Sequence, residues 1–160
     1  MAVEDKYTNS SVASGERGAA GFGGHELVVF RGTAAIAAAD DDGSKYRIIK
    51  GIPSSFKPLR CTVRTEAITG GTDYELGLYD TDLGAVVSKG LFMTGQTLAS
   101  ASRAIDGLSN VAVGNLGKTI AELLSLTPST AKPSYDLVLT GDTVGSAAGN
   151  VDIVLEGYSA

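Results

Sequence analysis

Glu26-Leu27-Val28-Val29-Phe30-Arg31 is the stretch that decides the fold class, together with the later stretch Tyr135-Asp136-Leu137-Val138-Leu139-Thr140. In each stretch the residues form two alternating sets, for example Leu27, Val29 and Arg31 against Glu26, Val28 and Phe30. Successive side chains of a β-strand point to opposite faces, so a period of two predicts strands. The chain between and around these stretches is rich in turn residues, which indicates an all-β protein.

These two stretches and others that are bounded by turn residues predict eight strands. They lie near 26–36, 45–52, 59–68, 74–79, 85–93, 110–113, 135–140 and 150–157, and the one at 110–113 is the weakest. Helical spacing predicts one short helix within Leu116–Leu126, which Thr127-Pro128 ends. Many short antiparallel strands with one inserted helix predict a jelly-roll-like antiparallel β-sandwich. An immunoglobulin-like sandwich is the main alternative, although the chain lacks its Trp and Cys-pair marks.

A length of 160 residues predicts one domain, and 21 glycines suit a chain with many tight turns. Residues 1–24 are rich in Ser, Ala and Gly without strand or helix periodicity, so we expect a flexible N-terminal arm followed by a β-sandwich domain over 25–160. An arm that orders against a partner and an arm that is merely solvated are both open. His25 stands at the junction, and we expect it to be exposed rather than a ligand or a base.

The net charge of −5 argues against a general nucleic-acid binder, since phosphate binding needs a clustered excess of Lys and Arg. No apolar run is long enough to span a bilayer, and residues 1–24 lack the layout of a secretory signal, so we expect a cytosol-like compartment. Cys61 is the single cysteine, which excludes an intrachain disulfide. It shares a predicted strand face with Leu59 and Val63, and we expect a small buried residue rather than a reactive thiol.

Charge is unevenly distributed along the chain. A segment without acids carries Lys45, Arg47, Lys50, Lys57, Arg60 and Arg64, and the next segment carries Glu66, Asp73, Glu75, Asp80 and Asp82 without a base. Solvated strand faces explain this pattern, and so does a surface that orients the protein against a charged partner. We select Lys45, Arg47, Arg60 and Arg64 as candidate docking residues, in two patches if the strands lie in opposite sheets.

Motifs for catalysis are weak throughout. Gly114-Asn115-Leu116-Gly117-Lys118-Thr119 ends like a phosphate-binding loop but has Ala112 where that loop needs glycine, and Ser54 with Lys57 lacks companion motifs. Asp40-Asp41-Asp42 and the Asp80, Asp82 pair offer oxygen ligands for Ca²⁺, but turn formation explains both. With one His and one Cys, we expect no enzyme, no catalytic residue, no metal site and no cofactor.

The segment Ala67-Ile68-Thr69-Gly70-Gly71-Thr72-Asp73-Tyr74-Glu75-Leu76-Gly77-Leu78-Tyr79-Asp80, followed by Gly84-Ala85-Val86-Val87, resembles the small capsid cement or decoration proteins of tailed bacteriophages. Shorter similarities lie at 37–44, 104–108, 135–137 and 141–149, so that the resemblance covers most of 26–157. It implies a jelly-roll-like β-sandwich that binds in many copies to the outside of a capsid and bridges major capsid subunits against internal DNA pressure.

The same resemblance implies the major capsid protein as partner, self-association on the capsid surface, no cofactor, no direct contact with nucleic acid or membrane, and a place on the virion exterior after synthesis in the host cytoplasm. It also suggests that the arm 1–24 becomes ordered on the assembled particle. The alternative is a β-sandwich adhesin or carbohydrate-binding module of a phage head or tail fibre, which would expose aromatics or Ca²⁺ ligands at one end. An enzyme with an unrecognised site is a weaker alternative.

Overall fold

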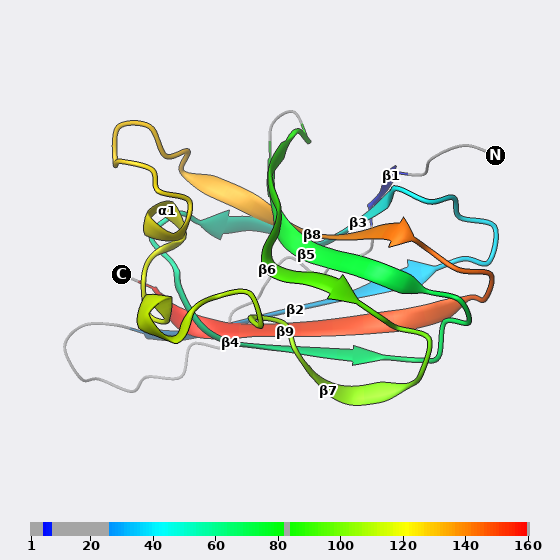
Figure 1. The fold of residues 1–160 in the computed structure, drawn as a ribbon. Coiled ribbons are helices and arrows are strands. Elements are labelled where there is room, and N and C mark those ends of the chain that lie inside the picture. Colours follow the sequence, from blue (N-terminus) through cyan, green and yellow to red (C-terminus); the bar gives the residue numbers. More distant parts are fainter. Residues whose placement is uncertain (1–4, 8–25, 82–83, 160) are drawn as a thin grey trace.

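The computed structural model describes residues 5–7, 26–81 and 84–159, which fold into two packed β-sheets (Figure 1). The first sheet contains, in spatial order, β1 (Asp5–Tyr7), β3 (Ser44–Pro53), β8 (Ser134–Thr143), β5 (Thr72–Asp80) and β6 (Val86–Gln96). The second sheet contains β2 (Glu26–Ile36), β9 (Gly149–Ser159), β4 (Lys57–Thr65) and β7 (Ser102–Asp106). Little helix is present among the described residues, so the predicted all-β class is confirmed.

The strand order is that of a jelly roll. From β2 onward the chain places β2, β4, β7 and β9 in one sheet and β3, β5, β6 and β8 in the other, so most successive strands lie in opposite sheets. All pairs among these strands are antiparallel, whereas β1 adds to the edge of β3 in parallel. Two interleaved four-stranded arrays of this kind define the jelly-roll sandwich.

The core lies between the sheets and is built by the inward set of each alternating strand. From β2 it takes Phe30, Ala34 and Ile36, and the ring of Phe30 meets that of Phe56 edge-on at 5.1 Å between centroids. Fully burying one large apolar side chain contributes roughly 1.5–3 kcal/mol. The other large side chains that are buried completely include Tyr46, Ile48, Ile52, Ile68, Tyr74, Leu76, Leu78, Phe92, Leu137, Leu139, Ile153 and Leu155.

The predicted strand at 110–113 is wrong. These residues form a turn that leads into a short 3₁₀ helix (Val113–Asn115), and the eighth strand of the jelly roll is β7 instead. β7 was missed because Ile105 is its one large apolar residue and the strand lies at a sheet edge, where little of it is buried. The remaining predicted strands are confirmed, with ends that differ by up to three residues.

The helix predicted within Leu116–Leu126 is confirmed but is a single turn, α1 (Ile120–Leu123). Thr119 caps it: its side chain accepts from the Glu122 backbone, and Glu122 accepts from the Thr119 backbone in return. The helix ends at once because Ser125 adopts a left-handed backbone with φ of 57°. No described helix is long and apolar enough to cross a membrane.

Candidate functional site

A large bulge in β6 covers part of the outer face of the first sheet. Leu76 pairs with Met93 but Leu78 pairs with Ser88, so four residues of β6 oppose Gly77 alone. The bulge crosses directly over this glycine: a Cβ on Gly77 would lie 2.0 Å from the Ser88 carbonyl oxygen and 2.3 Å from that of Lys89. β5 therefore needs a glycine here for the chain to fold back over it.

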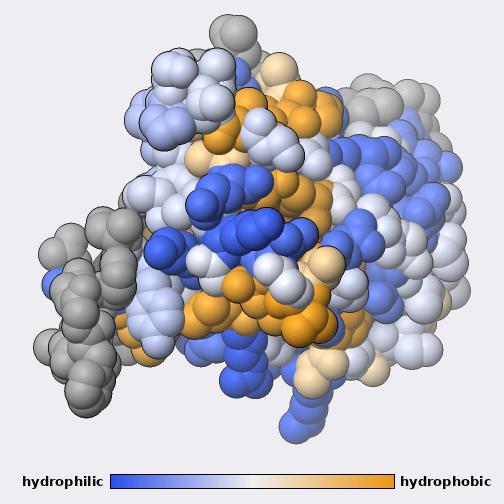
Figure 2. Space-filling model, turned by 60° about the vertical axis from the view of Figure 1, so that its left-hand side comes forward, coloured by the Kyte–Doolittle hydropathy of each residue, from blue (hydrophilic) through white to orange (hydrophobic). Residues whose placement is uncertain are grey.

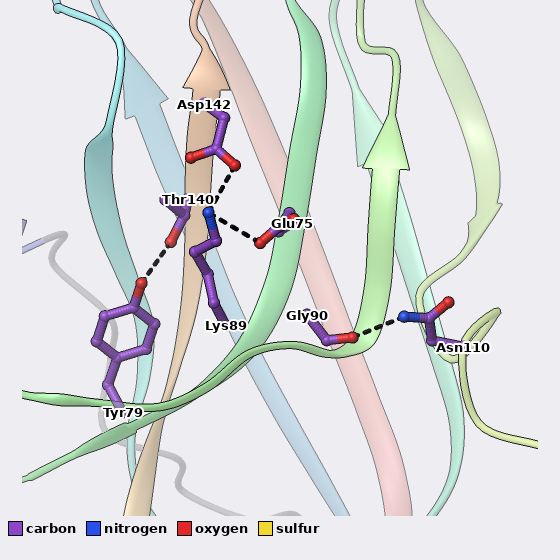
Figure 3. Close-up of polar contacts among 7 residues, drawn as sticks. All are labelled: Glu75, Tyr79, Lys89, Gly90, Asn110, Thr140 and Asp142. Atoms are coloured by element: carbon purple, nitrogen blue, oxygen red, sulfur yellow. Dashed lines mark hydrogen bonds and ion pairs between the residues drawn. The ribbon is translucent and has the colours of Figure 1, made fainter.

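Lys89, carried by this bulge, joins β5 to β8 (Figure 3). Its Nζ donates to Asp142 Oδ2 at 2.6 Å and lies 3.2 Å from Glu75 Oε2. The hydrogen bond to Asp142 is the main cause that raises the pKa of Lys89 above its usual value. On the other side of the bulge, Asn110 Nδ2 donates to the Gly90 carbonyl at 2.8 Å. These contacts attach the bulge to β5 and β8 through Lys89 and to the turn after β7 through Gly90.

The carboxylates around Lys89 have the spacing of a cation site. One oxygen each from Asp73, Glu75 and Asp142 lie within 4.8 Å of one another, and carboxylate oxygens are the ligands that Ca²⁺ prefers. However, the Lys89 ammonium already contacts two of the three. The arrangement is an ion-pair cluster that holds β6, with one ammonium between two of its three carboxylates, and a metal would have to displace Lys89 from it.

The same outer face continues with buried polar pairs toward β3. Tyr79 and Thr140 share a hydrogen bond of 2.8 Å, and burial raises the pKa of Tyr79 above its usual value. Arg47 Nη1 lies 3.6 Å from Oδ2 of Asp136, a carboxylate with no exposed surface that also accepts from the Gly51 backbone at 2.9 Å. This face is therefore built as an interior, with its charges paired.

The four predicted docking residues fall on two sheets, as the alternation of strands between sheets required. Lys45 and Arg47 lie on β3 in the first sheet, and Arg60 and Arg64 lie on β4 in the second. Arg47 is buried, and Lys45 is partly buried with its Nζ 5.8 Å from the centre of the Tyr79 ring. Arg60 and Arg64 are exposed, and Arg60 Nε lies 3.8 Å from Glu156 Oε2. Of the two pairs, only Arg60 and Arg64 are exposed.

Cys61 is buried beneath Arg60 and Arg64, and burial raises the pKa of its thiol to about 12. The thiol stays protonated and unreactive near neutral pH, as expected. The expectation that Leu59 shares its face is wrong. A register shift between Pro58 and Arg60 turns Leu59 outward, where it is 38% exposed.

The aspartate turn at 40–42 serves the fold. Asp40 accepts from the Tyr46 hydroxyl at 2.8 Å and from the Ala37 backbone at 2.9 Å, and Asp42 accepts from the Val144 backbone at 2.9 Å. Asp80 pairs with Lys132, while Asp82 lies outside the described residues. Hydrogen bonds therefore occupy the carboxylates of Asp40 and Asp42, and an ion pair occupies that of Asp80.

The other sequence candidates are placed as follows. The Gly114–Thr119 segment contains part of the 3₁₀ turn and the cap of α1, and Ser54 lies in the turn before β4, where its carbonyl accepts from the Ala121 backbone. His25 lies outside the described residues, as does most of the arm 1–24. Of the arm, the structure describes Asp5–Tyr7, which forms β1.

An exposed group of apolar residues, here called the apolar end, was not anticipated from the sequence. Leu27 pairs in register with Tyr158 where β2 begins and β9 ends, and Gly117 places the neighbouring loop beside Leu59. Figure 2 looks toward this end and shows hydrophobic surface interrupted by charged side chains. The apolar end consists of Leu27, Leu59, Val113, Leu116 and Tyr158. Strand alternation could not reveal it, because it depends on the bulge at Leu59 and on a loop.

The fold places this chain in the class of jelly-roll β-sandwich proteins. The outer face of its first sheet is partly covered by the chain itself, and the outer face of its second sheet is exposed. No protein-family model matches the chain, and no curated protein matches its sequence. Among solved structures, the chain is similar to one described as the cyanophage Pam1 capsid asymmetric unit, with a TM-score of 0.55 and 16% identity. The match covers 95% of this chain and 99% of that chain. It shows that the two share their fold over nearly their whole lengths.

Proposed function

We propose that this chain is a structural virion protein that binds the outer surface of a phage capsid and stabilises it by bridging major capsid subunits. The observation that carries the proposal is the near-complete mutual coverage, 95% and 99%, with a chain from a phage capsid asymmetric unit. The likeness therefore extends over nearly all of both chains. The independent sequence resemblance to cement proteins supports the same role.

The open face of the second sheet is the docking surface that we propose. Arg60 and Arg64 project from β4, and Leu59 beside them belongs to the apolar end. Stable interfaces combine a desolvated apolar centre with a polar rim, and charges on the rim speed association and select the partner. The apolar end would supply the centre, and the two arginines would form part of the rim against acidic groups of the capsid.

Charge reversal tests this surface. Arg60→Glu with Arg64→Glu should weaken binding to undecorated capsids by about tenfold or more at moderate salt, because two attractive contacts become repulsive. The matched control for each single change, Arg60→Glu or Arg64→Glu, is Lys50→Glu, which changes net charge equally at an exposed position on β3 in the other sheet. Co-sedimentation with capsids measures the double variant, the two single variants and the control. Occupancy by the double variant equal to that by Lys50→Glu would remove Arg60 and Arg64 from the interface.

A further inference from the structure

β3 is an edge strand whose outer side has an incomplete partner. β8 pairs with one side of β3 from Ser44 to Pro53, whereas on the other side, among the residues that the structure describes, β1 pairs with Lys45–Arg47 alone. An edge strand presents unpaired backbone groups, which are a template for another strand. Beyond Arg47 the β3 backbone is irregular, with register shifts on both sides of Ile49 and a left-handed Gly51 at φ of 73°. The regular part of the edge therefore suits a short strand.

The strand that occupies this edge is not tied to it by a hairpin. β1 runs parallel to β3, and parallel neighbours are joined by long connections. Residues 8–25 separate Tyr7 from β2, which lies in the opposite sheet. A segment of this length can span at most roughly 60 Å when extended, which exceeds the ~36 Å length of an eleven-residue strand. Chain length therefore does not restrict β1 to the β3 edge of its own molecule.

β1 has only three residues. The few backbone hydrogen bonds of so short a strand barely offset the conformational entropy lost when its residues are ordered. A terminal strand of this length can open locally while the rest of a sandwich stays folded.

We propose that the β3 edge is a strand-acceptor site and that, where copies are crowded, it binds Asp5–Tyr7 of a second copy of this chain. The occupant follows from the structure, since the segment seated at the edge is a segment of this same chain. The exchanged pairing has the same backbone partners as the internal one. The effective concentration of neighbouring copies then decides which β1 binds, and exchange links copies without a new interface.

Disulfide trapping tests the exchange. Asp5 pairs with Lys45 in register, and paired residues on neighbouring strands have the Cα separation that a disulfide needs. Protein with Asp5→Cys is mixed with protein carrying Lys45→Cys under mild oxidation at increasing concentration. Lys50→Cys is the matched control, because Lys50 is exposed on β3 beyond the paired residues. Cys61 stays in all variants, since it is buried.

The Asp5→Cys and Lys45→Cys mixture should give at least about tenfold more mixed dimer than the control mixture, because pairing raises the effective concentration of the two thiols. The double variant should link within one chain when dilute and between chains when concentrated. Equal dimer yields with Lys45→Cys and Lys50→Cys would overturn the proposal. So would a double variant that links only within one chain at every concentration. Either failure leaves the proposed function standing, because capsid binding is measured separately.

Discussion

The two outer faces of the sandwich arise from the same alternating pattern, but the charged side chains are buried on one face and exposed on the other. On the first sheet, the side chains of the ion pair Arg47 and Asp136 are 11% and 0% exposed; on the second, those of Arg60 and Glu156 are 73% and 36% exposed. The first face is covered in part by the chain's own β6 bulge, which crosses Gly77 and is held by Lys89. Charges on the first face are paired in the interior of the fold, whereas those on the second face are paired at the exposed surface.

Removing the buried cation is the strongest test of this difference. Arg47→Met should lower the free energy of unfolding by about 3–5 kcal/mol, because it leaves the carboxylate of Asp136 buried without its cation. The equivalent change on the open face, Arg60→Met, should cost no more than about 1 kcal/mol. Urea unfolding of both variants measures the contrast. Similar losses in the two would contradict the assignment of one face as interior.

The covering bulge can be displaced at Gly77. Gly77→Ala should destabilise the protein by about 2–3 kcal/mol, since its Cβ would overlap the backbone of β6 and force the strands apart. Gly114→Ala is the matched control, because a Cβ at Gly114 meets no atom within 4 Å. Thermal unfolding compares them. A Gly77→Ala variant as stable as the control would show that β6 does not cross the sheet at this residue.

Cys61, on the inward side of β4, should make the stability of the protein depend on pH, because burial raises its pKa from 9.0 to about 12. The thiol ionises first in the unfolded chain, so stability is complete below the unfolded pKa and falls as pH rises toward the folded pKa. This lowers the free energy of unfolding by about 1 kcal/mol near pH 9.5. Cys61→Ala should unfold with a shallower pH slope between about pH 8 and 10. An unchanged slope would refute this contribution.

The smallest expected effect on stability comes from removing the arm. A variant that starts at His25 loses β1 but keeps both faces, so its melting temperature should fall by no more than about 4 °C. On the particle the same variant should bind capsids more weakly and dissociate sooner, if the arm orders there. Calorimetry and capsid-binding kinetics separate the two effects. Capsid binding as tight as that of the intact chain would show that the arm is only a solvated tail.

The sequence predicted the sandwich because alternation is local, and residues such as Phe30 and Leu137 lie inside as their patterns require. It could not predict the covered face. The stretch Tyr135–Thr140 is buried on both sides of its strand, in part because the β6 bulge at Lys89 folds over the sheet and in part because Arg47 of β3 packs against Asp136. Arg47 and Arg60 therefore lie in similar alternating stretches of sequence, but the first is buried and the second is exposed. The bulge that turns Leu59 outward likewise leaves no periodic signal.

Immunogold labelling of intact virions with antibodies against this chain tests the central claim most directly. The account predicts many labels over the outer surface of the head, before any disruption of the particle, and loss of this label when the chain is omitted from assembly. Labels confined to the tail or its fibres, or labels that appear only after heads are broken open, would contradict a role on the capsid exterior.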